Sequence, residues 1–121
     1  MRVLIAEDNK AVAGTLAAMV DVSHHTVVAI VGSGLEAIHA YERHRPDVVI
    51  MDYLMNGLNG LTACRNILAK DPAANVILVS GALDPSELAL AQSGARAILR
   101  KPITTQQLRD LLNTLGPTPS A

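Results

Sequence analysis

The sequence predicts an α/β protein in which five parallel strands form one sheet, with helices covering both of its faces. Short apolar runs recur along the chain, and segments with helical periodicity separate them. Half of the 121 residues are hydrophobic, which is enough to build a core for one domain. This alternation of strand and helix is typical of doubly wound parallel sheets.

Five apolar runs are the expected strands. Most are rich in Val, Ile and Leu without polar alternation, a pattern typical of parallel strands that are buried on both faces. The runs lie at residues 3–6, 26–31, 47–51, 76–79 and 97–99.

The segments between these runs are expected to be helices. Apolar residues fall on one helical stripe in the first and last of them: Val12, Leu16, Met19 and Val20, then Leu108, Leu111, Leu112 and Leu115. Three pairs have the spacing of a capping box: Ser33 with Glu36, Asp84 with Glu87, and Thr104 with Gln107. Pro85 suits a first helical position, and Gly94 and Gly116 suit helix ends. The helix after the third strand is expected at about residues 59–70, with Cys64 inside it.

Right-handed crossovers limit the strand orders that such a chain can adopt. We adopt the flavodoxin-like order 2-1-3-4-5, a known order for doubly wound sheets, because the polar strand ends then converge. Residues 1–115 are expected to form this single domain. Residues 116–121 contain two prolines and are interpreted as a disordered tail or linker stub.

Composition excludes several functional classes. With 17% charged residues and a net charge of -1, the domain has no strong basic field to attract nucleic acid or membranes. No run of eighteen apolar residues predicts a membrane span, and the apolar start is too short for a signal peptide. A single cysteine forms no internal disulfide, so we expect a cytoplasmic protein.

Acidic residues follow two strands that would be neighbours. Glu7 and Asp8 come after the first strand, and Asp52 comes after the third. Three carboxylates in one crevice raise one another's pKa unless a cation lies between them. Oxygen ligands of this kind suit Mg²⁺, so the sequence predicts a metal site.

Two further strand ends carry groups that suit phosphate chemistry. Ser80 supplies a hydroxyl after the fourth strand, and Lys101 supplies an ammonium after the fifth. Metal, ammonium and hydroxyl together can surround a tetrahedral phosphoryl group. Asp52, at the end of the central strand, is the best-placed carboxylate to attack phosphorus.

The arrangement resembles the receiver domain of two-component response regulators over nearly the whole chain. The matching pieces are Glu7-Asp8, Asp52 with Met55 and Gly60, Ser80-Gly81-Ala82, and Gly94-Ala95 leading to Lys101-Pro102. The resemblance implies that Asp52 is the phosphoacceptor and that Ser80 and Lys101 contact the phosphoryl oxygens. It implies Mg²⁺ bound by Asp8, Asp52 and the backbone carbonyl of Leu54, with Glu7 acting through a water molecule. It also implies a cis Lys101-Pro102 bond.

The resemblance implies partners as well. The donor would be a histidine kinase or a histidine phosphotransfer protein. Phosphorylation would shift the face formed by helix 4, strand 5 and helix 5, which would then bind a downstream protein or a second receiver. The domain would catalyse only its own phosphorylation and dephosphorylation, and would not bind nucleic acid directly.

Three departures from the family pattern modify these expectations. Ile98 and Ile103 stand where aromatic residues are usual, so we expect a smaller or different rearrangement on phosphorylation. Asn56 replaces a usual proline, which predicts a more flexible loop. Leu54 and Ala82 carry no group that could orient water, which predicts a long-lived phosphoryl state.

Other functions stay open at this stage. A Mg²⁺-dependent phosphohydrolase with Asp52 as nucleophile is the main alternative, although Leu54 stands where such enzymes place a second acid. A receiver-like interaction module that is never phosphorylated is another. Flavin binding is disfavoured, because the acidic turn after the first strand would repel a phosphate. We interpret His24 and His25 as a solvated loop pair, Cys64 as a buried apolar residue, and Tyr41 and Tyr53 as packing residues.

Overall fold

A computed structural model describes residues 1–55, 59–81 and 93–115 of the chain. The strands are β1 (Arg2–Ala6), β2 (Thr26–Val31), β3 (Val48–Asp52), β4 (Val76–Ser80) and β5 (Ala97–Arg100). The helices are α1 (Lys10–Val22), α2 (Gly34–His44), α3 (Gly60–Lys70) and α5 (Thr105–Leu115). The expected helix after the fourth strand, with its Asp84 and Glu87 pair, and the expected tail at 116–121 lie outside the described residues.

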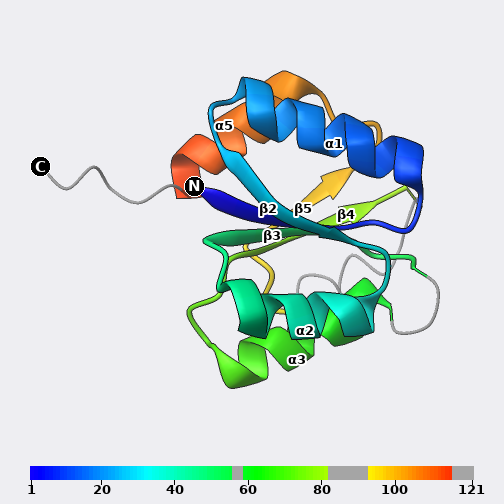
Figure 1. Cartoon of the computed structure of the whole chain (residues 1–121), viewed down its shortest axis with the longest axis vertical. Helices are drawn as coiled ribbons and strands as arrows, with labels where there is room; N and C mark the ends of the chain where they lie inside the picture. The colour runs from blue at the N-terminus through cyan, green and yellow to red at the C-terminus, as the bar shows by residue number, and fades with distance from the viewer. Residues whose placement is uncertain (56–58, 82–92, 116–121) are drawn as a thin grey trace, which may run out of the picture.

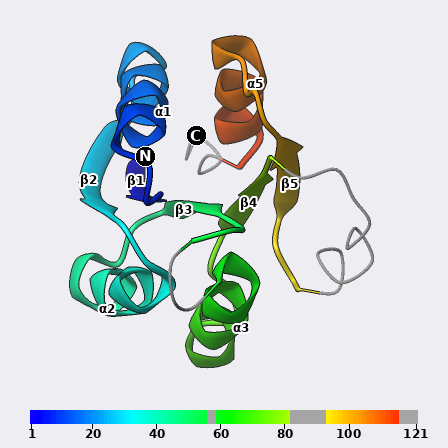
Figure 2. The same ribbon diagram turned by 90° about the vertical axis from the view of Figure 1, so that its right-hand side faces the viewer.

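The five strands form one parallel sheet in the order β2-β1-β3-β4-β5, which confirms the predicted order. Helices α1 and α5 cover one face of this sheet, and α2 and α3 cover the other (Figures 1 and 2). The carboxyl ends of all five strands therefore meet at one edge of the sheet, which is where ligands bind in folds of this class.

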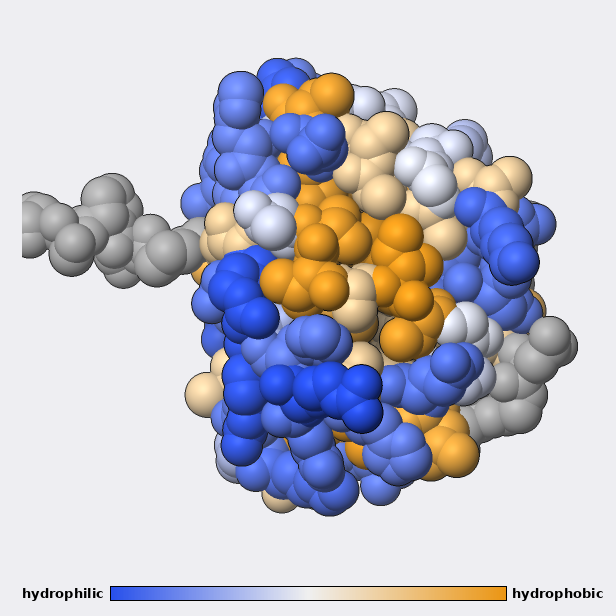
Figure 3. All heavy atoms as spheres, in the orientation of Figure 1, coloured by the Kyte–Doolittle hydropathy of each residue, from blue (hydrophilic) through white to orange (hydrophobic). Residues whose placement is uncertain are grey.

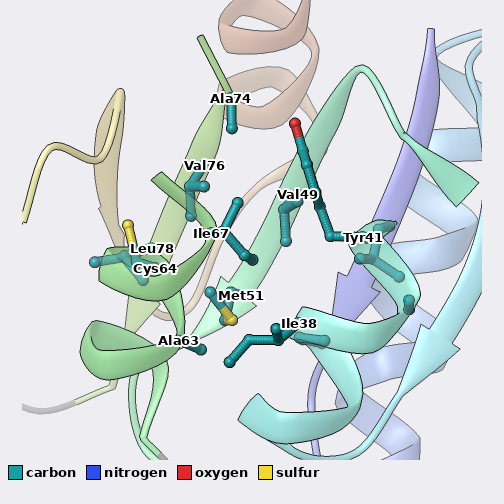
Figure 4. Packing of buried hydrophobic residues seen from close by; sticks show 14 of the residues in the cluster. Ile38, Tyr41, Val49, Met51, Ala63, Cys64, Ile67, Ala74, Val76 and Leu78 are labelled. Carbon is teal, nitrogen blue, oxygen red and sulfur yellow. The ribbon is translucent and has the colours of Figure 1, made fainter. Parts of the chain in front are cut away.

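Within residues 1–55, 59–81 and 93–115, the core consists of two clusters, one on each face of the sheet. Alternate residues of β1 and β3 point to opposite faces: Leu4 and Val49 pack towards α2 and α3, whereas Val3 and Val48 pack towards α1 and α5. Figure 4 shows the first cluster, in which Tyr41 of α2 and Ile67 of α3 lie over the sheet. Cys64 is buried in this cluster, as expected.

The expectation that every strand is buried on both faces is wrong for the two outer ones. Residues of β3 and β4 are all buried, whereas β2 and β5 have no fully buried residue: β2 is exposed at Thr26 and Ile30 and partly buried elsewhere, and β5 alternates between partly buried and exposed residues. The reason is position: β2 and β5 are the outer strands of the sheet, so each has only one neighbouring strand.

Helix starts follow the predicted polar spacings. The backbone N–H of Glu36 donates to Ser33 Oγ at 3.1 Å at the start of α2. At α5, Gln107 N–H donates to Thr104 Oγ1 and Thr104 N–H donates to Gln107 Oε1, which is the complete reciprocal box.

Among the described residues, no helix is both long and apolar enough to span a membrane.

Interpreting His25 as a solvated loop residue is wrong. His24 is exposed and has a φ of 66°, but His25 turns inward and its Nδ1 lies 2.8 Å from the amino group of Met1. The tight turn after α1 brings His25 back against the start of β1, because Thr26 N–H donates to Met1 O at 2.9 Å. Sequence spacing alone does not reveal this contact.

Candidate functional site

The three acidic side chains predicted to converge do so. Glu7 and Asp8 follow β1, Asp52 ends β3, and these two strands are paired neighbours. One carboxylate oxygen from each residue lies within 4.8 Å of the others, a grouping that could hold a metal ion. Asp8 is exposed, while Glu7 and Asp52 are only 3% and 7% exposed. The site is therefore open to solvent on the Asp8 side.

Glu7 is held by three contacts at the end of β1. Its backbone N–H donates to Val31 O at 2.9 Å, which continues the pairing with β2. Its Oε2 accepts from the N–H of Asn9 at 3.0 Å, and its Oε1 accepts from Lys101 Nζ at 2.9 Å. Asn9 also caps α1 by accepting from the N–H of Val12. Sequence reasoning missed Asn9, although a polar residue just before a helical stripe is a capping signal.

Lys101 reaches the acidic cluster from the end of the outer strand β5. Its N–H donates to Ser80 O at 2.9 Å, so the residue extends the pairing of β5 with β4. Its Nζ lies 3.4 Å from Asp52 Oδ1 as well as 2.9 Å from Glu7 Oε1. The Lys101-Pro102 peptide bond is cis, as expected. The ammonium thus lies between two of the three acids.

Electrostatics at the site favour an added cation. Burial, reinforced by the charge of Glu7, raises the pKa of Asp52 to about 6, although Lys101 opposes this rise. Burial alone would lower the pKa of Lys101, but its contacts with Glu7 and Asp52 outweigh it and raise that pKa. One ammonium does not balance three carboxylates. Hard oxygen donors at this spacing fit Mg²⁺, which takes few protein ligands and keeps several waters.

The remaining predicted residues lie at the same edge of the sheet. Ser80 ends β4, is 8% exposed, and pairs in register with Arg100. Leu54 follows Asp52 by two positions and is 59% exposed. Tyr53 between them packs against the core cluster under α2 and α3, which agrees with a packing role.

Gly60 shows why the resemblance includes a glycine here. At this position α3 starts directly against the end of β3, and the N–H of Gly60 donates to Tyr53 O at 2.8 Å. A Cβ on Gly60 would lie 2.2 Å from the backbone oxygen of Asp52. Only glycine allows the helix to begin this close to the reactive strand end.

Fold and site together define a receiver domain, and comparison with known proteins agrees. Residues 3–113 match the family model described as "Response regulator receiver domain", so the chain belongs to that family. Its relatives include the chemotaxis protein CheY of Listeria monocytogenes, 32% identical, with 93% of this chain and 95% of that protein covered. The protein-glutamate methylesterase/protein-glutamine glutaminase of Nitrosospira multiformis is 37% identical, but only 30% of its length is covered.

Solved structures show the same fold. CheY in the CheX-CheY-BeF3-Mg+2 complex from Borrelia burgdorferi matches with a TM-score of 0.88 at 24% identity, covering 97% of this chain and 90% of that one. The response regulator domain of Thermotoga maritima CheB matches with a TM-score of 0.81 at 29% identity, covering 95% and 92%. This chain is thus a receiver domain of two-component systems.

Proposed function

We propose that this receiver accepts a phosphoryl group on Asp52 with the help of Mg²⁺. The observation that carries the proposal is the position of Lys101 Nζ, 2.9 Å from Glu7 and 3.4 Å from Asp52, in a cluster of three carboxylates. A carboxylate beside one fixed cation and a metal site can attack phosphorus, because both cations neutralise charge on the phosphoryl oxygens.

In the proposed reaction, a carboxylate oxygen of Asp52 forms the new bond to phosphorus while the bond to the donor's leaving group breaks. Lys101 and the hydroxyl of Ser80 contact the phosphoryl oxygens. Asp8, Asp52 and the carbonyl of Leu54 would hold Mg²⁺ directly, and Glu7 would hold it through water. The metal supplies charge neutralisation during transfer. Glu7, held by Lys101 and Asn9, keeps its carboxylate in a fixed orientation.

We further propose that the donor is a histidine kinase or a histidine phosphotransfer protein and that the output is binding of a downstream protein or a second receiver. The proposed output face includes β5, where Ile98 is 36% exposed, and α5. Its remaining part falls in residues 82–92, outside the described residues. Because Ile98 has no ring that could swing, we expect a smaller rearrangement there than an aromatic residue would give.

The phosphohydrolase alternative lacks a residue that it needs. Enzymes of that kind place a second acid two positions after the nucleophile to protonate the leaving group. Here that position is Leu54, whose exposed side chain has no proton to give. The domain is accordingly proposed to catalyse only its own phosphorylation and slow dephosphorylation.

Incubation with acetyl phosphate and Mg²⁺, followed by intact mass measurement, tests the proposal. We expect addition of one phosphoryl group, no addition to Asp52→Asn, and strongly reduced addition to Asp8→Asn. The control is Asp110→Asn, which changes an exposed acid on α5 and should behave like the parent. Equal uptake by Asp52→Asn and the parent would contradict the assignment of Asp52. Rapid loss of the group from the purified protein would contradict the long lifetime expected from Leu54 and Ala82.

A further inference from the structure

The outer strand β2 carries apolar surface on the face of the molecule seen in Figure 1. Its six residues, Thr26–Val31, contain no charged side chain, and Ile30 is 48% exposed. In Figure 3 a continuous hydrophobic area crosses this face between polar rows. Figure 2 shows β2 at the outside of the sheet with α1 above it and α2 below it. A contiguous apolar area with a polar rim is typical of an interaction surface, whereas single exposed apolar residues are not.

Small residues of α1 line this strand. Two hollows lie between α1 and β2, one of about 350 Å³ beside Gly14 and Ile30, and one of about 390 Å³ beside Ala18 and Val27. A Cβ on Gly14 would meet nothing within 4 Å, so packing inside this chain does not require glycine there. Glycine within a helix costs roughly 0.5–1 kcal/mol relative to alanine. Close approach of a second surface would account for a small residue at this position.

Two charged residues on the same side of α1 have opposite signs, so this side of one copy is complementary to the same side of a second copy. Lys10 lines the hollow at one end of the helix, and Asp21 lines the hollow at the other end. They are about three helical turns apart and exposed. If two copies meet about a two-fold axis with their α1 helices antiparallel, Lys10 of each copy faces Asp21 of the other. A two-fold contact of this kind is isologous and closes after two copies.

We propose that the β2 edge and the adjoining side of α1 form a self-association surface whose occupant is a second copy of this chain. The contact rests on side chains rather than on an extended sheet. In the pairing with β1, Val3 aligns with Val27 and Leu4 with Ala29, so Val28 is an extra residue that bulges from the edge. Edge bulges hinder open-ended strand pairing. Asp8 lines the hollow beside Lys10 and reduces the positive charge there, so the dimer is weak and depends on concentration.

Sedimentation equilibrium of the full chain at concentrations up to about 1 mM tests the surface. The parent is expected to show a monomer–dimer equilibrium, and Ile30→Glu is expected to be monomeric throughout. The matched control is Ala69→Glu, which places the same charge on an exposed position of α3, away from β2 and α1. This control should dimerise like the parent. A parent that is monomeric throughout, or a dimer lost in Ala69→Glu and kept in Ile30→Glu, would overturn the proposal.

Charge reversal tests the two-fold arrangement separately. Lys10→Asp and Asp21→Lys should each weaken self-association about tenfold or more, since like charges then face each other twice in every dimer. Mixing the two variants should restore association, because each then presents the charge that the other lacks. Both changes favour α1 itself, with an acid at its start and a base at its end, so unfolding does not explain a loss. A mixture no stronger than the single variants would refute the antiparallel contact.

Discussion

Replacing Gly60 with alanine tests whether the close contact between α3 and β3 holds the reactive strand end in place. The added Cβ would lie 2.2 Å from the backbone oxygen of Asp52 and 3.0 Å from both Asp52 C and Tyr53 Cα. These are backbone atoms of a buried strand end, and no flexible side chain can yield. The start of α3 must therefore move away from β3 by about 0.8 Å or more to bring this contact beyond 3.0 Å.

The size of the effect follows from two opposing contributions. Forcing an extra methyl group into a packed interior costs typically 1–3 kcal/mol. Alanine regains up to about 1 kcal/mol over glycine within a helix, but Gly60 is the first residue of α3, where that gain is smaller. We expect a net loss of about 2 kcal/mol. With a urea dependence of 1–3 kcal/mol per molar, the unfolding midpoint should fall by roughly 1 M.

Urea unfolding followed by far-ultraviolet circular dichroism measures this loss. The matched control is Gly14→Ala, the same substitution in α1, where the new Cβ meets nothing within 4 Å. Gly14→Ala should raise the stability of the monomer by roughly 0.5–1 kcal/mol. A Gly60→Ala protein as stable as the parent, or both variants changing in the same direction, would refute the reasoning. Phosphoryl uptake by Gly60→Ala should also slow, since the shift begins at Asp52 itself.

Two pH dependences follow from side chains outside the site. Burial and the hydrogen bond to Asp71 raise the pKa of Tyr41 to about 12. The stability that this contact contributes is therefore intact below pH 10 and declines towards pH 12. Absorbance at 295 nm follows the ionisation of Tyr41, with Tyr41→Phe as the control. Burial and the neighbouring amino terminus lower the pKa of His25, so stability present above about pH 6.5 falls as the pH drops. Acid unfolding of His25→Gln should lack that decline, and an unchanged acid profile would contradict it.

The sequence was sufficient for the sheet because its central strands are apolar throughout. Val48–Asp52 and Val76–Ser80 have every residue buried, so apolar runs and polar ends coincide with strand bodies and strand ends. The strand order itself was adopted from known folds. The outer strands were less predictable: Thr26–Val31 is as apolar as the inner ones, yet Ile30 is 48% exposed. Composition does not distinguish an inner strand from an outer strand whose exposed apolar residues are proposed to contact another molecule.

The convergence of the acidic residues with Lys101 was predictable, but their individual contacts were not. The carboxyl ends of parallel strands lie at one edge of the sheet, which is why Glu7 and Lys101 could be expected near each other although they are 94 positions apart. The contribution of Asn9 could not be read in this way. Its backbone N–H orients Glu7 while its side chain caps α1, and such a dual role depends on the local turn geometry. The need for glycine at position 60 likewise depends on the close approach of α3 to the end of β3, which only the three-dimensional structure reveals.

The contacts of Lys101 constrain how a test of its function can be interpreted. The family resemblance assigned Lys101 to the phosphoryl oxygens, whereas its Nζ is nearer to Glu7, at 2.9 Å, than to Asp52, at 3.4 Å. Removing Lys101 would leave Glu7, with a side chain only 1% exposed, without its cation. Loss of one partner of a buried ion pair destabilises strongly. Reduced phosphorylation of Lys101→Ala therefore indicates a chemical role only if its unfolding midpoint matches that of the parent protein.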